Sequence, residues 1–157
     1  MRAELINPFV KANTSVISMM GATELNQKNS YLVKEVTLKD DIGIVIGVTG
    51  EIRGQVVLSF QESFAKKIVS NMMGGMPVET IDDIGKSALS ELGNMILGNA
   101  ATGLFENGYQ IDITPPSLLS GESVIYSTIN QQIIVVPFET EMGNLNLNIS
   151  LKDKDEK

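Results

Sequence analysis

The sequence predicts an α+β domain in which helices pack on an antiparallel sheet of about six strands. Two observations carry this prediction: apolar residues switch between helical and strand spacing along the chain, and the connections between neighbouring strands are too short for a crossover helix. The expected order is one helix, three strands, two helices and three to four strands, which gives an approximate internal symmetry. With 157 residues, 43% of them apolar, the chain can build one sizeable core. We therefore expect a single domain over residues 1–151 and a disordered tail over residues 152–157.

Gly and Pro set the expected limits of the elements in the first half. Residues 4–20 have helical spacing, with Pro8 in the first turn and Gly21 as a stop. Residues 31–60 are rich in β-branched and aromatic residues and are broken twice, which predicts three antiparallel strands over 31–40, 42–50 and 53–61.

The second half begins with two helices, over residues 62–75 and about 81–107. Strands are then expected near residues 109–113, 123–130, 131–139 and 144–152. Pro115 and Pro116 predict a loop over residues 114–123, to which we assign no chemistry.

Charge and composition exclude several classes of function. The chain has 12 Lys and Arg against 19 Asp and Glu, a formal net charge of −7, and no basic run longer than Lys66-Lys67. A nucleic acid or an anionic membrane surface is therefore not expected as a partner. The N-terminal segment has charges within its apolar pattern, so we expect neither a secretory signal nor a membrane span, and we expect a cytoplasmic protein.

The chain contains no Cys and no His. This excludes disulfides, thiol chemistry, a Ser-His-Asp triad, a phosphohistidine and the commonest zinc ligands. Any catalysis must use carboxylates, amides, hydroxyls, Lys or a metal held by oxygen ligands, and we expect the chain to bind no metal or cofactor of its own.

The long helix has two different faces. At about 100° per residue, one narrow line collects small and polar residues, and roughly the opposite side is apolar. The narrow line contains Ser87, Glu91, Asn94, Gly98 and Ala101, and the apolar side contains Leu89, Leu92, Ile96 and Ala100. Spacing alone leaves two interpretations open, an ordinary solvent-exposed face or a binding site, and Glu4 and Asn7 show that the Glu-x-x-Asn spacing also arises elsewhere in the chain.

Four glycines interrupt this helix, and each costs about 0.8–1 kcal/mol relative to Ala. Gly85 and Gly103 project toward the apolar side, where close packing on the sheet is a sufficient explanation. Gly98 lies on the polar line, has no core to pack against, and fits a docking site better. Gly93 points near the edge of the core, and its role stays only partly explained.

The stretch SALSELGNMILGNAATGL, followed by DITPPSLLSG, resembles the CheC/CheX/FliY group of chemotaxis phosphatases. The signature of that group is an acidic or Ser residue, three residues, Glu, two residues, Asn, and then a Gly-Asn-Ala run. The single complete motif and the segment INPFVKA resemble CheX more than CheC, which typically carries the motif twice.

The resemblance implies hydrolysis of the aspartyl phosphate on a CheY-type response-regulator receiver domain in two-component signalling. It implies that Glu91 binds the active-site Lys of the receiver and that Asn94 orients the attacking water, with a supporting, partner-binding role for Ser87. It also implies that Mg²⁺ comes from the receiver and that the protein forms a homodimer through the sheet.

Two alternatives stay open at this point. A non-catalytic receiver-binding module of a chemotaxis or flagellar switch complex would use the same face without hydrolysis. A small-molecule enzyme has little support, because the sequence has no phosphate-binding loop, dinucleotide fingerprint or metal-ligand cluster.

Overall fold

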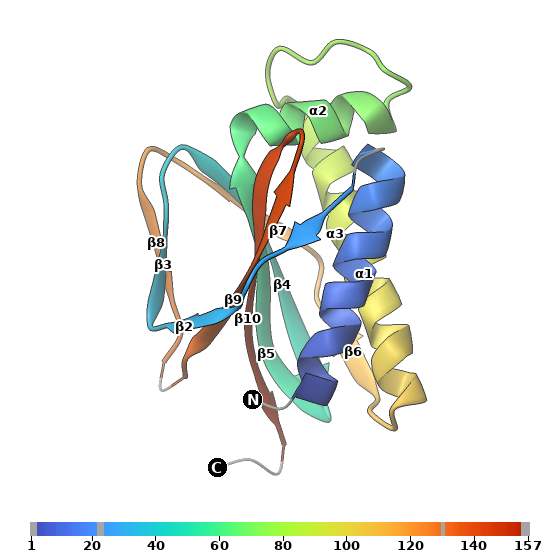
Figure 1. Ribbon diagram of the computed structural model, residues 1–157, viewed down its shortest axis with the longest axis vertical. Coiled ribbons are helices and arrows are strands. Elements are labelled where there is room, and N and C mark those ends of the chain that lie inside the picture. The colour runs from blue at the N-terminus through green and yellow to red at the C-terminus, as the bar shows by residue number, and fades with distance from the viewer. Residues whose placement is uncertain (1–2, 22–23, 130, 155–157) are drawn as a thin grey trace.

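The computed structural model describes residues 3–21, 24–129 and 131–154. Its three helices are α1 (Ala3–Gly21), α2 (Glu62–Met72) and α3 (Asp83–Glu106). The strands are β1 (Asn26–Gln27), β2 (Tyr31–Val33), β3 (Glu35–Leu38), β4 (Asp41–Gly50), β5 (Ile52–Gln61), β6 (Ile111–Ile113), β7 (Ser117–Ser120), β8 (Val124–Ser127), β9 (Ile133–Thr140) and β10 (Gly143–Asp153). Figure 1 shows their arrangement.

The main sheet is antiparallel and follows the order β1-β9-β10-β5-β4-β6. Two further short strands share its edges, since β2 pairs with β9 as β1 does, and β7 pairs with β4 as β6 does. The sheet is therefore six strands wide, and the predicted α+β class with an antiparallel sheet of about six strands is confirmed.

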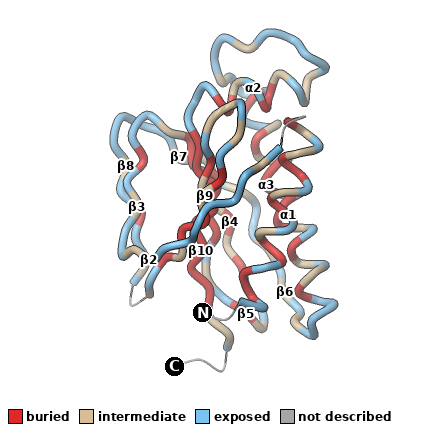
Figure 2. The backbone as a smooth tube through the Cα atoms, in the orientation of Figure 1, coloured by how far each residue is buried: buried red, intermediate tan, exposed pale blue. Residues whose placement is uncertain are grey.

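The core lies between this sheet and the helices. α1 and α3 run side by side over one face, and α2 crosses one end (Figure 1). Buried positions line the strands and the sheet-facing sides of the helices (Figure 2), because strand side chains alternate between faces and helical ones repeat every three to four residues. All four residues of the predicted apolar side of α3 are buried, which confirms that face.

A second, smaller sheet pairs β3 with β8 on the opposite side of the main sheet (Figure 1). It covers a small cluster that includes Val57 and Val135. Tyr126 of β8 donates a hydrogen bond from its hydroxyl to Gln55 Oε1 at 2.9 Å, and burial raises the pKa of this hydroxyl to about 12. The two-stranded sheet of β3 and β8, called the β3–β8 ribbon below, therefore covers part of the sheet face that the helices leave uncovered.

The single strand expected over residues 31–40 is wrong. The chain bends at Lys34, so that β2 joins the edge of the main sheet beside β9 while β3 leaves it to pair with β8. A continuous β-rich pattern predicts extended backbone, but it does not specify which strand each part will pair with.

The loop expected over residues 114–123 is also wrong in part. Ser117–Ser120 forms strand β7, which pairs with residues 42–45 of β4. Pro115 and Pro116 only separate β6 from β7 along the same partner strand, because a proline removes its own N–H and does not affect the donors that follow it.

The start of the predicted tail belongs to the sheet. β10 continues to Asp153, with Lys152 opposite Arg53 and Asp153 opposite Ile52, and the Lys154 N–H donates to the Glu51 carbonyl at 2.9 Å. Residues 155–157 of the expected tail lie outside the described residues. Within the part of the chain that the structure describes, no helix is both long and apolar enough to cross a membrane.

Candidate active site

The site that the sequence predicts lies on α3, whose two ends are fixed by local hydrogen bonds. At the start, the Asp82 side chain caps the helix by accepting from the Gly85 N–H at 2.9 Å. At the end, Gly108 adopts a φ of 91°, which favours glycine, and the Tyr109 N–H returns to the Leu104 carbonyl at 2.9 Å. These caps bound a helix of 24 residues, about 36 Å long, that carries the site.

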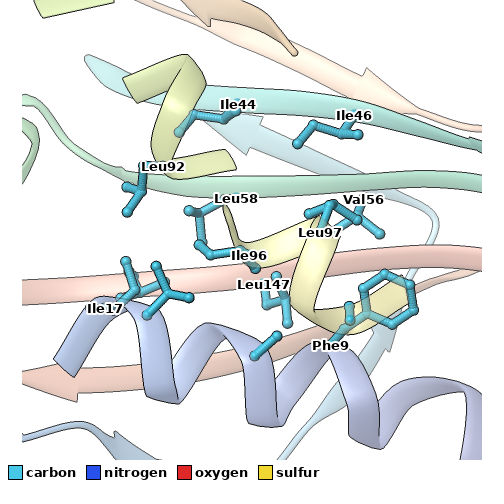
Figure 3. Packing of buried hydrophobic residues seen from close by; sticks show 14 of the residues in the cluster. Phe9, Ile17, Ile44, Ile46, Val56, Leu58, Leu92, Ile96, Leu97 and Leu147 are labelled. Atoms are coloured by element: carbon cyan, nitrogen blue, oxygen red, sulfur yellow. The ribbon is translucent and has the colours of Figure 1, made fainter. Parts of the chain in front are cut away.

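α3 sits unusually close to strand β4. A Cβ placed on Gly93 would lie 2.9 Å from Ile44 Cγ2 and 3.0 Å from Ile46 Cδ1. Figure 3 shows these isoleucines in the same apolar layer as Leu92 and Ile96 of α3. Gly93, only partly explained by spacing, is therefore the point of close approach that seats the helix on the sheet.

Two other glycines pack differently from the prediction. Gly103 faces α1, where an added Cβ would meet Pro8 Cβ at 3.2 Å. Gly85 faces Ile81 and Val69, at 3.4 and 3.8 Å from their methyl groups. The expected packing of both on the sheet is wrong, because spacing along one helix gives the buried side but not which neighbour fills it.

All four predicted site residues lie on the face of α3 that points away from the sheet. Ser87, Glu91 and Asn94 are exposed. Gly98 is half-buried, and no atom lies within 4 Å of the position that its Cβ would occupy. Neighbours three and four residues apart on a helix have Cβ atoms about 5–6 Å apart, so the carboxylate of Glu91 and the carboxamide of Asn94 act on one small area.

The two central side chains have no partner within the described part of the protein. None of its hydrogen bonds or ion pairs involves the side chain of Glu91 or Asn94. An exposed carboxylate and an exposed carboxamide held on a capped, well-packed helix keep their full capacity for hydrogen bonds. The arrangement can therefore place one negative charge and one neutral donor–acceptor group against another molecule.

The second Glu-x-x-Asn pattern, on α1, is arranged differently. Glu4 Oε1 accepts a hydrogen bond from the Tyr109 hydroxyl at 3.1 Å, and the adjacent Pro8 packs on α3. This carboxylate therefore has a contact within the protein, unlike Glu91. Among the residues that the structure describes, no three carboxylates lie close enough together to hold a metal ion.

The chain matches the family model of the chemotaxis phosphatase CheX over residues 42–139, a range that contains all of α3. The protein belongs to the CheX family. It is 35% identical over 124 residues to the CheY-P phosphatase CheX of Thermotoga maritima, a match that covers 79% of this chain and 80% of that protein.

Solved CheX structures share the fold along nearly the whole chain. The CheX crystal structure from Desulfovibrio desulfuricans superimposes with a TM-score of 0.85 at 30% identity, covering 95% of this chain and 99% of that one. The Borrelia burgdorferi CheX, solved in a complex with CheY, BeF₃ and Mg²⁺, gives a TM-score of 0.79 at 25% identity, covering 96% and 99%.

Two further residues on α3 were not singled out from the sequence. Ile84 is 62% exposed and Phe105 is 68% exposed, one on each side of the CheX-family motif. Phe105 follows Gly98 by seven residues, which is two helical turns, so a search for the continuation of the polar line would have found it.

Proposed function

We propose that this CheX-family protein hydrolyses the aspartyl phosphate of a CheY-type receiver domain. The observation that carries the proposal is the outward pair Glu91 and Asn94, both exposed and both without a partner in the described protein. Membership of the CheX family and the similarity to a CheY-P phosphatase support the same reaction.

The reaction needs little covalent chemistry from this protein. A water oxygen attacks phosphorus in line, the bond between phosphorus and the aspartyl oxygen breaks, and the products are the free aspartate carboxylate and inorganic phosphate. Phosphoryl transfer depends mainly on positioning of the nucleophile and on neutralisation of the phosphoryl oxygens. A protein without His or Cys is therefore suited to it, because the aspartate carboxylate is a good leaving group and needs no strong general acid.

Asn94 orients the attacking water in this proposal. Its carboxamide carries one acceptor and two donors, so it can hold water on one side and a phosphoryl oxygen on the other. It is uncharged, and so it does not repel the phosphoryl group as a carboxylate would. Its place on a capped helix fixes its direction, which is what in-line attack requires.

Glu91 contacts the active-site Lys of the receiver. An ion pair of this kind is a charge-assisted hydrogen bond. It fixes the position of the receiver relative to α3 without a contact to the phosphate. Ser87, one turn earlier on the same face, supports this contact with its hydroxyl. Gly98 has open space above its backbone and lets the receiver come close. Mg²⁺ is supplied by the receiver.

The experiment compares the decay of a phosphorylated CheY-type receiver with and without the purified protein. The proposal expects faster release of inorganic phosphate, in proportion to the concentration of the protein. Co-elution with the receiver without faster decay would instead establish the non-catalytic receiver-binding module.

The proposal extends to the assembly and location of the protein. Strand β2 pairs only with β9 among the described strands, and its Tyr31 and Leu32 are 50% and 58% exposed. An open edge with apolar side chains supports a homodimer through the sheet. A receiver substrate supports a cytoplasmic location.

A further inference from the structure

The outward face of α3 extends well beyond the motif in both directions. Eleven residues separate Asn94 from Phe105, which at about 100° per residue is three full turns and about 20°. Phe105 therefore lies on the same line as Asn94, and Ile84, ten residues before Asn94, lies about 80° away, at the edge of that face. At about 1.5 Å per residue, Asn94 is nearly midway between two exposed apolar side chains that are about 31 Å apart along the helix.

The segment between Asn94 and Phe105 has only small side chains on this line. On this line it carries only Gly98 and Ala101, and space is open above Gly98. A hollow of about 590 Å³ opens beside it between α1 and α3, with Asn7, Lys11 and Thr102 among its lining residues. The exposed Phe105 side chain lies at the far end of this segment. The face therefore has a shallow region that ends at a large apolar side chain.

The size of the face suits a folded protein partner. A stable protein interface buries about 800 Å² on each side, a patch roughly 30 Å across. The motif from Ser87 to Asn94 spans only about 10 Å, which is too short for such a contact, whereas the span from Ile84 to Phe105 is sufficient. The charged side chains on this line, Asp83 and Glu91, are both acidic, so the face fits a partner that offers a basic group surrounded by apolar surface.

We infer that Phe105 and Ile84 are apolar anchors for the same receiver whose phosphate Asn94 addresses, and that they set the affinity for that receiver. The inference rests on the proposed function and on the continuity of one helix face. Exposed apolar residues that occur singly are ordinary on protein surfaces. Here the two bracket the motif on one helix, and apolar and aromatic side chains that a partner buries contribute to binding through the hydrophobic effect.

The test measures steady-state hydrolysis of the phosphorylated receiver and binding of a BeF₃⁻-activated CheY-type receiver from the same organism. Phe105→Ala is expected to raise KM and Kd about five- to tenfold with kcat within about twofold of the wild type. Ile84→Ala is expected to change the same quantities in the same direction by a smaller factor, since it lies at the edge of the face. Ala favours the helix at both positions, so both variants are expected to fold, which a thermal melt checks.

The matched control is Ile125→Ala on β8, which removes a side chain of similar exposure, 63%, from the β3–β8 ribbon on the opposite side of the sheet. It is expected to leave KM and Kd unchanged. Unchanged KM and Kd in both α3 variants of an active enzyme would overturn the inference that Phe105 and Ile84 bind the receiver. The proposed function would stay intact. A lower kcat at constant KM would overturn the same inference.

Failure of the proposed function has a different signature. A wild-type protein that binds the activated receiver without hydrolysing the phosphorylated one would remove the phosphatase activity, and Kd for Phe105→Ala would still decide the anchors. A wild-type protein that neither binds nor hydrolyses any CheY-type receiver of its organism would overturn both.

Discussion

Asn94 is an exposed carboxamide on a rigid helix, and the proposed reaction depends on the two donors and one acceptor of this side chain. Asn94→Ala removes the water-binding group and leaves the helix intact, because Ala is a better helix former than Asn. We expect kcat for receiver dephosphorylation to fall at least tenfold, a rise of about 1.4 kcal/mol in the barrier, with little change in the melting temperature.

Asn94→Asp is the matched control, since it keeps the shape and replaces the amide with a negative charge. It is expected to be as slow as Asn94→Ala, because a carboxylate repels the phosphoryl group. A phosphate-release assay measures both variants. Turnover close to the wild type in Asn94→Ala would contradict the role assigned to Asn94.

Glu91 is expected to act through its charge. Glu91→Gln keeps the length of the side chain and one acceptor oxygen, but it replaces the other carboxylate oxygen with an NH₂ donor and loses the ion pair with the receiver Lys. We expect KM for the phosphorylated receiver to rise several-fold, and we expect KM of the wild type to increase more steeply with salt than KM of the variant, because salt screens exposed charges.

Kinetics at two ionic strengths tests this prediction. An identical salt dependence of KM in the two proteins would show that the carboxylate makes no ion pair across the interface. Glu35→Gln on β3 is the control, as it removes an exposed carboxylate from the opposite side of the main sheet and is expected to leave the salt dependence unchanged.

At the scale of single residues, periodicity predicted which side of α3 each residue faces. The CheX resemblance predicted which of these residues take part in the reaction. The pattern was sufficient for Glu91 and Asn94, because a helix fixes the relative direction of residues three apart. It was insufficient for Gly93, whose role depends on how closely β4 approaches the helix. That distance is set by the whole packing of helix on sheet, which no local pattern contains.

At the scale of the element, α3 offers two glycines with opposite surroundings. Gly98 has nothing within 4 Å of its missing Cβ, so Gly98→Ala is expected to stabilise the protein by about 0.8–1 kcal/mol through helix propensity alone. The same methyl group would stand on the proposed receiver-binding face, so kcat/KM is expected to fall several-fold. Thermal unfolding and receiver dephosphorylation measure the two effects separately.

Gly93→Ala is the internal control, because the gain in helix propensity is the same. Its methyl group would meet Ile44 and Ile46 at 2.9 and 3.0 Å, and overpacking of this kind costs about 1–3 kcal/mol. Gly93→Ala is therefore expected to be less stable than Gly98→Ala by about that amount. Equal stability of the two variants would show that α3 is not held as close to β4 as described.

The elements themselves were predictable where one period persisted over many residues. The three helices and the long strands β4, β5, β9 and β10 follow from such runs. Of the short strands, β6 and β8 were predicted, β1 and β7 were missed, and β2 and β3 were merged into one, because two to four residues carry little pattern. The split between β2 and β3, and the pairing of β7 with β4, are decided by partners distant in the sequence.

At the scale of the whole molecule, the proposed receiver-binding face of α3 and the open sheet edge are separate surfaces. The motif faces outward from α3, whereas β2 lies beyond β9 at the edge of the sheet (Figure 1). Tyr31 and Leu32 are neighbours in a strand and point to opposite faces, yet both are at least half exposed. A second copy at this edge would cover both side chains without blocking access of a receiver to α3.

The corresponding prediction concerns the mass of the particle in solution. Sedimentation at micromolar concentration is expected to give twice the 17.0 kDa of one chain. Leu32→Lys places a charge on the edge, and charged residues on edge strands oppose pairing, so this variant is expected to sediment as a monomer. Met19→Lys, which alters a side chain of similar exposure, 64%, on α1, is expected to remain a dimer.

The phosphatase activity per chain of the monomeric variant should stay near that of the wild type, since each α3 carries a complete motif. A wild-type monomer at tens of micromolar would disprove the dimer, and loss of activity on dissociation would show that the two surfaces depend on each other.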